Sequence, residues 1–136
     1  MTLIEREFQV ETKRRSQMVD VTSTLQAMVK DEGVGSGRMT VTVPHTTAGI
    51  TINEYADPDV ARDILSHLEK MVPREGGWRH AEGNSAAHIK TVLVGSTITL
   101  WVSGGTLELG TWQGVFICEF DGPRRRRVAV TASGSE

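Results

Sequence analysis

Three of the four histidines lie in polar segments that glycines interrupt, where an imidazole can bind a metal ion or carry a proton near neutral pH. They are His45, His80 and His88. Along one straight helix, His80 and His88 would be about 12 Å apart, too far to share a metal whose Zn–N bonds are about 2.0 Å long. Gly83 and Asn84 lie between these two histidines and allow the chain to fold back. We therefore keep all three histidines as candidates for one site.

A helix is expected to begin at Asn84 or Ser85 and to end at Gly95. His88 would lie near its start, where the positive end of the helix dipole favours the neutral imidazole that a metal ion requires. The same helix start offers unpaired backbone N–H groups to an anion such as phosphate. The spacing is equally compatible with Asn84 and Ser85 as simple caps and with His80 as an ordinary surface residue.

Two carboxylates are the best candidates for acid–base chemistry. Glu54 follows the apolar run 50–52, and Glu82 lies two positions after His80. Either could orient an imidazole or transfer a proton. Asp57, by contrast, is explained by its place before a proline at the start of a helix.

The run of four arginines at 124–127 invites a comparison with RNA-binding tracts. Side chains alternate between the two faces of a strand, so the run forms no continuous basic stripe, and no aromatic residue is interleaved to stack bases. We expect Arg124 to turn inward as a phosphate clamp. Trp112 and Gln113 could line a pocket as a rigid wall and an amide donor.

Hydrophobic periodicity indicates more strands than helices, without regular βαβ alternation, which favours an α+β fold over a doubly wound sheet. Strands are expected at 4–10, in a short segment ending near 19, and at 39–43, 97–102, 111–120 and 126–131; helices are expected to begin at 22, 57–58 and 84–85. We expect residues 132–136 to form a frayed tail.

Length and charge narrow the function classes. The 136 residues fit one domain, 1–136, and 15 basic against 17 acidic residues give a net charge of −2. A general nucleic-acid or anionic-membrane binder would be basic overall, so we expect neither partner. Charges interrupt the N-terminal apolar residues and no long apolar run follows, so we expect a soluble, cytoplasmic protein.

Taken together, several blocks of the sequence resemble, in order and over nearly the whole chain, the signature of the YjbQ family of small proteins. The blocks are His45–Gly49 followed by Asn53–Glu54, then His80–Asn84, Ala87–His88, Gly95, Leu109–Gly114 and Asp121–Arg124. One block would be a weak signal, but the set is specific.

The resemblance implies an α+β sandwich of mostly antiparallel sheet with about three helices, assembled as a homotrimer with a polar site near the subunit contacts. It also implies, for some members, a secondary thiamine-phosphate synthase activity. Carried over by position, the histidines are metal-binding or catalytic residues. The predicted roles are catalysis by His45, Glu54 and Glu82, binding of a divalent metal (zinc or magnesium) by His45, His80 and His88, and binding of a small phosphorylated metabolite by Thr46, Thr47, Asn53, Asn84, Gln113 and Arg124.

Three functions remain open at this stage. The first joins a pyrimidine diphosphate to a thiazole phosphate with release of pyrophosphate, although the sequence has no aspartate-rich diphosphate motif and no P-loop. The second is metal-dependent hydrolysis of a small phosphate or carboxyl ester, with Glu54 or Glu82 as base. The third is a non-catalytic trimer that binds a small ligand. We expect Val115, Phe116 and Trp101 at the trimer contact.

Overall fold

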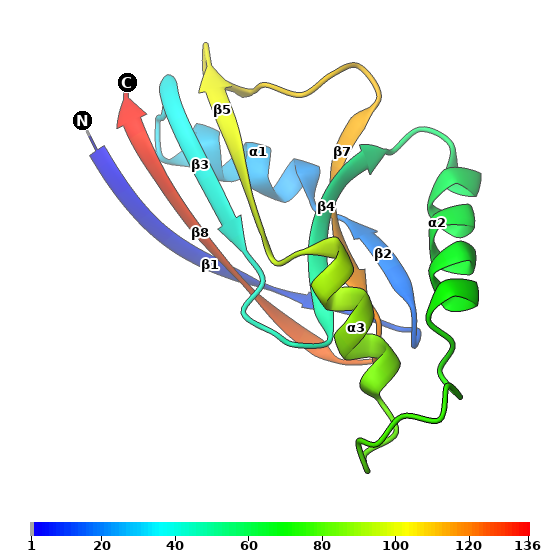
Figure 1. The fold of residues 1–136 in the computed structure, drawn as a ribbon. Helices are drawn as coiled ribbons and strands as arrows, with labels where there is room; N and C mark the ends of the chain where they lie inside the picture. The colour runs from blue at the N-terminus through cyan, green and yellow to red at the C-terminus, as the bar shows by residue number, and fades with distance from the viewer. Residues whose placement is uncertain (1) are drawn as a thin grey trace.

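Two antiparallel sheets form the body of the fold in the computed structural model, which describes residues 2–136. The elements are β1 (Thr2–Glu11), β2 (Gln17–Asp20), α1 (Thr22–Asp31), β3 (Ser36–Thr42), β4 (Ala48–Glu54), α2 (Pro58–Met71), α3 (Ser85–Val94), β5 (Thr97–Ser103), β6 (Thr106–Leu107), β7 (Gln113–Glu119) and β8 (Arg125–Ser135). The larger sheet has the order β1-β8-β3-β5-β6, and the smaller one has the order β2-β7-β4 (Figure 1). The predicted α+β fold of mostly antiparallel sheet with three helices is confirmed.

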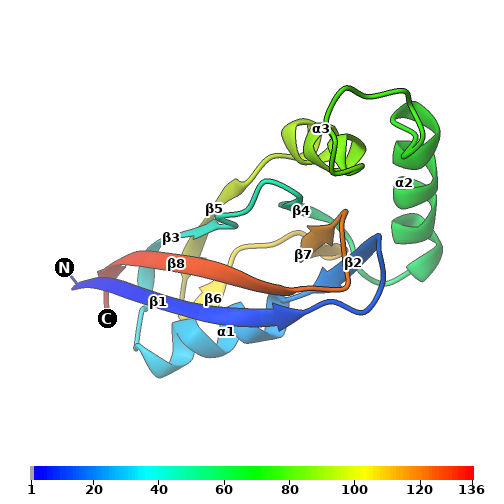
Figure 2. The ribbon, with the colours of Figure 1, turned by 90° about the horizontal axis from the view of Figure 1, so that it is seen from below.

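The main core lies where the inner faces of the two sheets and α1 meet. Alternation along β3 turns Met39 and Val41 inward, and Ile50 of β4 and Ile117 of β7 meet them from the smaller sheet. Leu25 of α1 is fully buried in the same cluster. The smaller sheet lies between the larger sheet on one side and α2 and α3 on the other, as the view from below shows (Figure 2).

The C-terminal residues differ from our expectation of a frayed tail. Residues 132–135 continue β8, with Ala132 opposite Ile4 of β1 and opposite Met39 of β3. Because β8 has a hydrogen-bonded strand on each side, its end is fixed by pairing that local Ser and Gly composition does not reveal.

The residues expected at a subunit contact separate into two groups. Val115 and Phe116 are only 0% and 6% exposed and belong to the protomer's own interior, so that prediction was wrong for them. An unbroken apolar run is typical of a strand buried on both faces, which is the place that β7 occupies. Trp101 is 60% exposed, so the prediction that it lies at a subunit contact stays a prediction.

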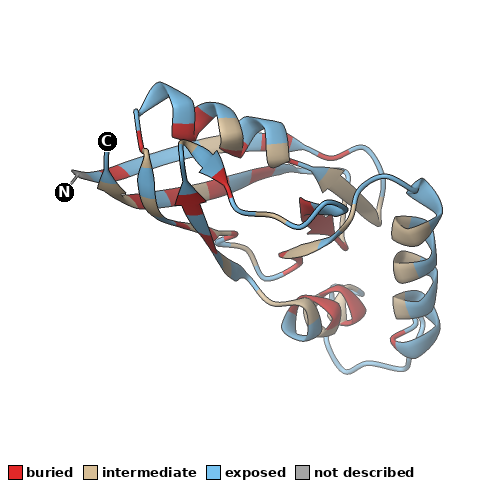
Figure 3. Cartoon of the chain, turned by 90° about the horizontal axis from the view of Figure 1, so that it is seen from above, coloured by how far each residue is buried: buried red, intermediate tan, exposed pale blue. Residues whose placement is uncertain are grey.

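Two helices frame the end of the small sheet. The Asp57 side chain caps α2 by accepting a hydrogen bond from the Asp59 N–H, and Pro58 begins the helix, as predicted. α2 has no buried residue and lies at the edge of the molecule, whereas α3 packs beside β4 (Figure 3). None of the helices in residues 2–136 has the length and apolar character needed to span a bilayer.

Candidate functional site

His80 and His88 form a pair at the start of α3. Their ring centroids are 5.6 Å apart and the rings meet edge to face at 83°. Gly83, with φ of +76°, provides the turn between them, because a residue with a side chain rarely adopts that backbone conformation. The fold-back expected from Gly83 is therefore present, and the pair presents two imidazoles to one region.

The carboxylate of Glu82 lies beside this pair. Its Oε2 is 3.7 Å from the Nε2 of His80, and its side chain is 76% exposed. At this distance and exposure the two groups make no strong ion pair.

His45 has a different environment from the other two histidines. The pairing of β3 with β8 ends at Thr42 opposite Ala129, and the His45 Nε2 then accepts a hydrogen bond of 2.9 Å from the next available backbone N–H of β8, that of Arg127. An imidazole nitrogen that accepts from an N–H has no proton, so the neutral ring carries its proton on Nδ1. His45 is therefore oriented by β8 and presents an N–H donor at Nδ1.

The pKa of His45 is held below its usual value of 6.5. Burial is the largest cause and the nearby Arg126 guanidinium the second, because both disfavour a second positive charge. The neutral form therefore predominates at neutral pH. Its lone pair at Nε2 is already engaged by Arg127, which leaves no free nitrogen lone pair for a metal ion in this conformation.

A buried ion pair lies directly beneath His45. Arg126, on the inner face of β8, donates from Nε to Glu119 Oε1 at 2.8 Å, and its Nη2 also contacts Glu119 Oε2. The same Nη2 donates to the Thr47 hydroxyl at 2.9 Å and to the Thr47 carbonyl at 3.2 Å. The Thr12 hydroxyl completes the set by donating to Glu119 Oε1 at 2.7 Å. The segment that carries His45 is thus fixed by charge-assisted hydrogen bonds.

Glu119 stays ionised although it is completely buried. Burial is the largest influence and raises its pKa, but the hydrogen bonds from Arg126, the Asp121 N–H and Thr12 together lower the pKa below its usual value of 4.5. The pair therefore holds charge inside the protein without leaving it unpartnered.

Asp121 connects this buried pair to α3. Its N–H donates to Glu119 Oε2 at 3.0 Å, and its Oδ2 accepts from Asn84 Nδ2 at 3.0 Å and from Arg124 Nη2 at 2.9 Å. Arg15 approaches the other carboxylate oxygen at 3.3 Å. Burial raises the Asp121 pKa, but the Asn84 and Arg124 hydrogen bonds outweigh it and lower the pKa below 3.8. A continuous network therefore links β7 to the first turn of α3.

Asn84 occupies the N-cap position of α3, but its side chain does not cap the helix. Its amide nitrogen is used by Asp121, and its Oδ1 is buried with no hydrogen-bond partner among the described residues. An unpartnered buried acceptor is costly, and the described residues supply no donor to this oxygen.

The remaining predicted residues lie at the other end of the small sheet. Ala48 pairs with Glu119 and Glu54 pairs with Gln113, six positions further along β4, which corresponds to about 20 Å. Glu54 Oε2 there accepts from the Ala56 N–H, Asn53 Oδ1 accepts from the Glu54 N–H, and Gln113 Oε1 accepts from the Gly110 N–H. Glu54, Asn53 and Gln113 therefore cannot act on the histidine end of the same protomer.

The arginine expected to turn inward was assigned incorrectly. Arg124 is exposed and lies before β8 begins, whereas Arg126 is the buried one, because β8 alternates from Arg125 onward and turns Arg126 inward with Val128.

Within the described residues, no group of three or more His, Cys, Asp or Glu side chains is placed to hold a metal ion. The three histidines thus divide into a pair at α3 and a separate donor at β8.

The chain also resembles proteins of known sequence and structure. A family model described as "UPF0047 protein YjbQ-like" matches residues 6–135. The chain belongs to the YjbQ family. YugU of Bacillus subtilis is a family relative with 46% identity over 127 residues, covering 93% of this chain and 96% of YugU. A UPF0047 protein of Methanocaldococcus jannaschii is 46% identical over 129 residues, covering 95% of this chain and 94% of the relative.

Solved structures of YjbQ-family proteins share the fold. A crystal structure of a YjbQ/UPF0047 family protein from Clostridium acetobutylicum matches with a TM-score of 0.92 at 49% identity, covering 94% of this chain and 99% of that one. A YbjQ-like protein of unknown function from Sulfolobus solfataricus matches with a TM-score of 0.94 at 30% identity, covering 98% and 99% of the two chains. The YjbQ fold is thus retained at 30% identity.

Some residues of the site were missed in the sequence. Glu119 and Arg126 were not singled out, although Glu119 is the only charge in the apolar run 115–120. A single carboxylate within a buried strand requires a cationic partner, and the arginine run that follows could supply one. Thr12 carried no comparable signal.

Proposed function

We propose that this YjbQ-family protein is an enzyme that binds a small phosphorylated metabolite and a divalent metal ion beside the start of α3. The observation that carries the proposal is the His80–His88 pair, whose rings lie 5.6 Å apart. Beside it lie the unpartnered Asn84 oxygen and the exposed Glu82 carboxylate. Two candidate metal ligands and a candidate base thus lie within the short segment 80–88, which supports the proposal.

Phosphate binding is supported by the charge around Asp121. Arg15 and Arg124 both contact this one carboxylate, so two guanidinium groups face one negative charge. The first turn of α3 contains no acidic residue, and its backbone N–H groups add partial positive charge. Thr46 is exposed, and the residue after it, Thr47, is joined to the neighbour of Asp121 by a hydrogen bond from the Phe120 N–H to the Thr47 carbonyl.

The donor set fits zinc better than magnesium. Two imidazole nitrogens are typical zinc ligands, whereas magnesium prefers oxygen ligands and retains its waters. His80 and His88 would supply two positions, and water, substrate or a neighbouring subunit would supply the others. A bound zinc ion would neutralise phosphate charge. In a hydrolase, Glu82 would accept a proton from the attacking water, and the His45 Nδ1–H would donate to a substrate oxygen. In the synthase reaction the thiazole nitrogen would attack through its lone pair while the C–O bond to pyrophosphate breaks, so no proton leaves the nucleophile and Glu82 would have no role as a base.

Glu54, Asn53 and Gln113 can take part in the histidine site only in an assembly of several subunits, and we propose a homotrimer. Glu54, Asn53 and Gln113 lie about 20 Å from the histidine end, so they reach a histidine site only from a neighbouring subunit. Exposed apolar side chains support assembly: on α3, Val92 is 81% exposed and Leu93 is 55% exposed. Analytical ultracentrifugation tests this step, and a monomer at micromolar concentration contradicts it.

The test compares metal binding and turnover in matched variants. We expect His80→Ala and His88→Ala to lower bound zinc, measured by equilibrium dialysis and elemental analysis, by at least about tenfold each. His67→Ala removes an exposed histidine of α2 and is expected to leave zinc binding unchanged. Unchanged zinc binding in both site variants contradicts the proposal.

The same proteins distinguish two reactions. Product formed from a pyrimidine diphosphate and a thiazole phosphate, with release of pyrophosphate, supports a thiamine-phosphate synthase. Hydrolysis of p-nitrophenyl phosphate without that product supports the hydrolase. For the hydrolase, Glu82→Gln is expected to lower kcat by about 10²-fold while zinc binding persists, whereas synthase turnover should not depend on a base at this position. Tight ligand binding with no turnover of either substrate contradicts the enzyme and leaves a binding protein.

A further inference from the structure

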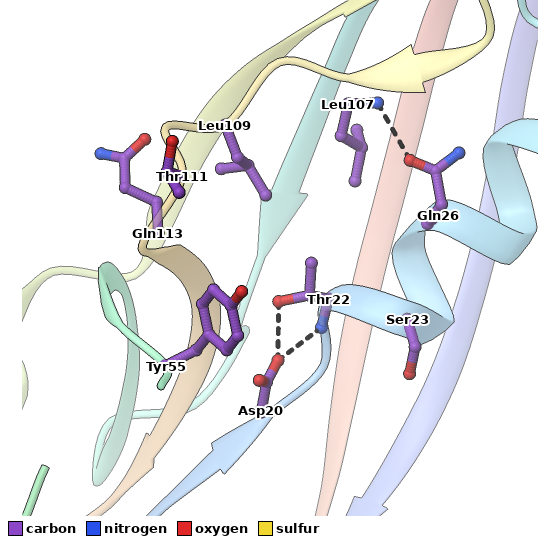
Figure 4. A pocket seen from close by; sticks show the side chains of 9 residues that line it. All are labelled: Asp20, Thr22, Ser23, Gln26, Tyr55, Leu107, Leu109, Thr111 and Gln113. Atoms are coloured by element: carbon purple, nitrogen blue, oxygen red, sulfur yellow. Dashed lines mark hydrogen bonds between the residues drawn. The ribbon is translucent and has the colours of Figure 1, made fainter. Parts of the chain in front are cut away.

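A hollow in the surface lies away from the histidines. It has a volume of about 630 Å³, within the range of small-molecule sites, and it opens between the first turn of α1 and the segment after β6. Figure 4 shows Tyr55 on one side, Gln26 and Ser23 of α1 on the other, and Leu107 and Leu109 between them.

Asp20 is the one residue with a formal charge among those that line this pocket. Its Oδ1 accepts hydrogen bonds from the Thr22 N–H at 2.9 Å and from the Thr22 hydroxyl at 2.6 Å. Within residues 2–136, no hydrogen bond or ion pair engages its Oδ2. The α1 N-terminus offsets part of the charge, equivalent to roughly half an elementary charge, so the pocket keeps a net negative character.

The walls supply apolar contact and a small number of polar groups. Leu107 and Leu109 form the apolar part of the lining. Gln26 is fully engaged, because its amide donates to the Gly105 carbonyl and accepts from the Leu107 N–H. Tyr55, 51% exposed, contributes an aromatic ring and a hydroxyl at the opening.

We propose that this pocket, defined by Asp20, Tyr55, Leu107 and Leu109, binds a small molecule that carries an ammonium or amidinium group on an apolar ring. The cationic group would donate to Asp20 Oδ2, and the ring would lie against the two leucines. We expect anionic ligands to bind weakly here, because the lining residues include Asp20 and no lysine or arginine. The ligand chemistry is thus opposite to that proposed at α3.

The proposal does not rest on the function proposed for the histidines. The lining contains none of His80, Glu82, Asn84 and His88, and Gln113 is the one lining residue that the proposed function also uses, from a neighbouring subunit. His88→Ala is therefore expected to leave ligand binding here unchanged. If zinc binding fails at α3, this pocket is still testable, and the reverse also holds.

The test uses benzylamine as the probe on the complete, isotope-labelled protein. In ¹H–¹⁵N NMR titrations, we expect saturable shifts at the backbone amides of Leu107, Leu109 and Gln113. Benzoate has a similar ring and the opposite charge, and it is expected to produce no saturable shifts there.

Two variants and one control variant show where benzylamine binds. Asp20→Asn keeps an oxygen to cap Thr22 but removes the charge, so it is expected to weaken benzylamine binding about fivefold. Ser23→Phe fills the pocket and is expected to abolish the shifts, whereas Thr24→Phe, on the next residue and outside the lining, is expected to leave them intact. The proposal is overturned if benzoate binds as tightly as benzylamine, if the pocket amides show no saturable shift, or if Asp20→Asn binds benzylamine as wild type does.

Discussion

Arg126 and Glu119 form an ion pair that is almost completely shielded from water, with side chains only 5% and 0% exposed. Removing one partner leaves the other charged and buried, which costs far more than the pair itself contributes. We therefore expect Glu119→Ala and Arg126→Ala each to lower the free energy of unfolding by about 3 to 5 kcal/mol, measured by urea denaturation.

Two controls define that prediction. Arg62→Ala breaks the exposed Arg62–Asp59 pair, whose side chains are 76% and 68% exposed, and is expected to change stability by less than about 1 kcal/mol. The double variant Glu119→Leu with Arg126→Met removes both charges and is expected to recover part of the loss. Equal, small effects of the buried and exposed single variants would contradict the burial of this pair.

The low pKa of Glu119 makes stability depend on pH. A carboxyl whose pKa is lower in the folded state than in the unfolded state binds fewer protons when folded, so its stabilisation is complete above its usual pKa of 4.5. That stabilisation is lost as the pH falls below 4.5 through the folded value. We expect the unfolding free energy to decrease with falling pH in this window. Glu119→Gln should be less stable at pH 7 and should show a shallower decrease, and a parallel decrease in both proteins would contradict the assignment.

His45 provides a prediction at the level of single atoms. Because Nε2 accepts from the Arg127 N–H, we expect the Nδ1–H tautomer of the neutral ring, visible in long-range ¹H–¹⁵N spectra of the metal-free protein. Burial and Arg126 should place its pKa below 6.5, measured in the same titration. His67 on α2 is exposed and serves as the internal comparison. An Nε2–H tautomer for His45 would contradict the hydrogen bond.

Local sequence signals predicted the elements well and the buried polar network poorly. Pro58 after Asp57, and Gly83 before Asn84, set backbone geometry within a few residues, so the start of α2 and the fold-back of His80 onto His88 followed from the sequence. The end of β8 and the burial of Arg126 depend instead on the strands beside β8, which lie far away in sequence. Propensity carries no information about such neighbours.

In the candidate site too, what depends on tertiary pairing could not be predicted from the sequence. The family resemblance identified Glu54 and His45 together, but sequence order does not give their separation along the β4–β7 ladder. His45 as a metal ligand also stays a prediction, and in this conformation its Nε2 lone pair is used by Arg127. Each of these outcomes is decided by tertiary pairing.

One unequal ion pair adds to the packing of Leu65 and Leu68 in attaching α2 to the rest of the fold. Lys90 of α3 donates from Nζ to Glu69 of α2 at 2.7 Å, with the lysine side chain 4% exposed and the glutamate side chain 50% exposed. If Lys90 is replaced, Glu69 can be hydrated, but if Glu69 is replaced, the ammonium group stays buried without its carboxylate. We therefore expect Glu69→Ala to cost about 1 to 3 kcal/mol and Lys90→Met distinctly less.

Hydrogen exchange tests this asymmetry directly. α2 has no buried residue of its own, so loss of the contact should open the helix locally, and its amides should exchange faster in Glu69→Ala than in Lys90→Met. Lys70→Met alters the neighbouring exposed lysine and is expected to leave exchange as in the wild type. Faster exchange in Lys90→Met than in Glu69→Ala would mean that the lysine charge itself, and not the cost of burying it unpaired, determines how α2 is held.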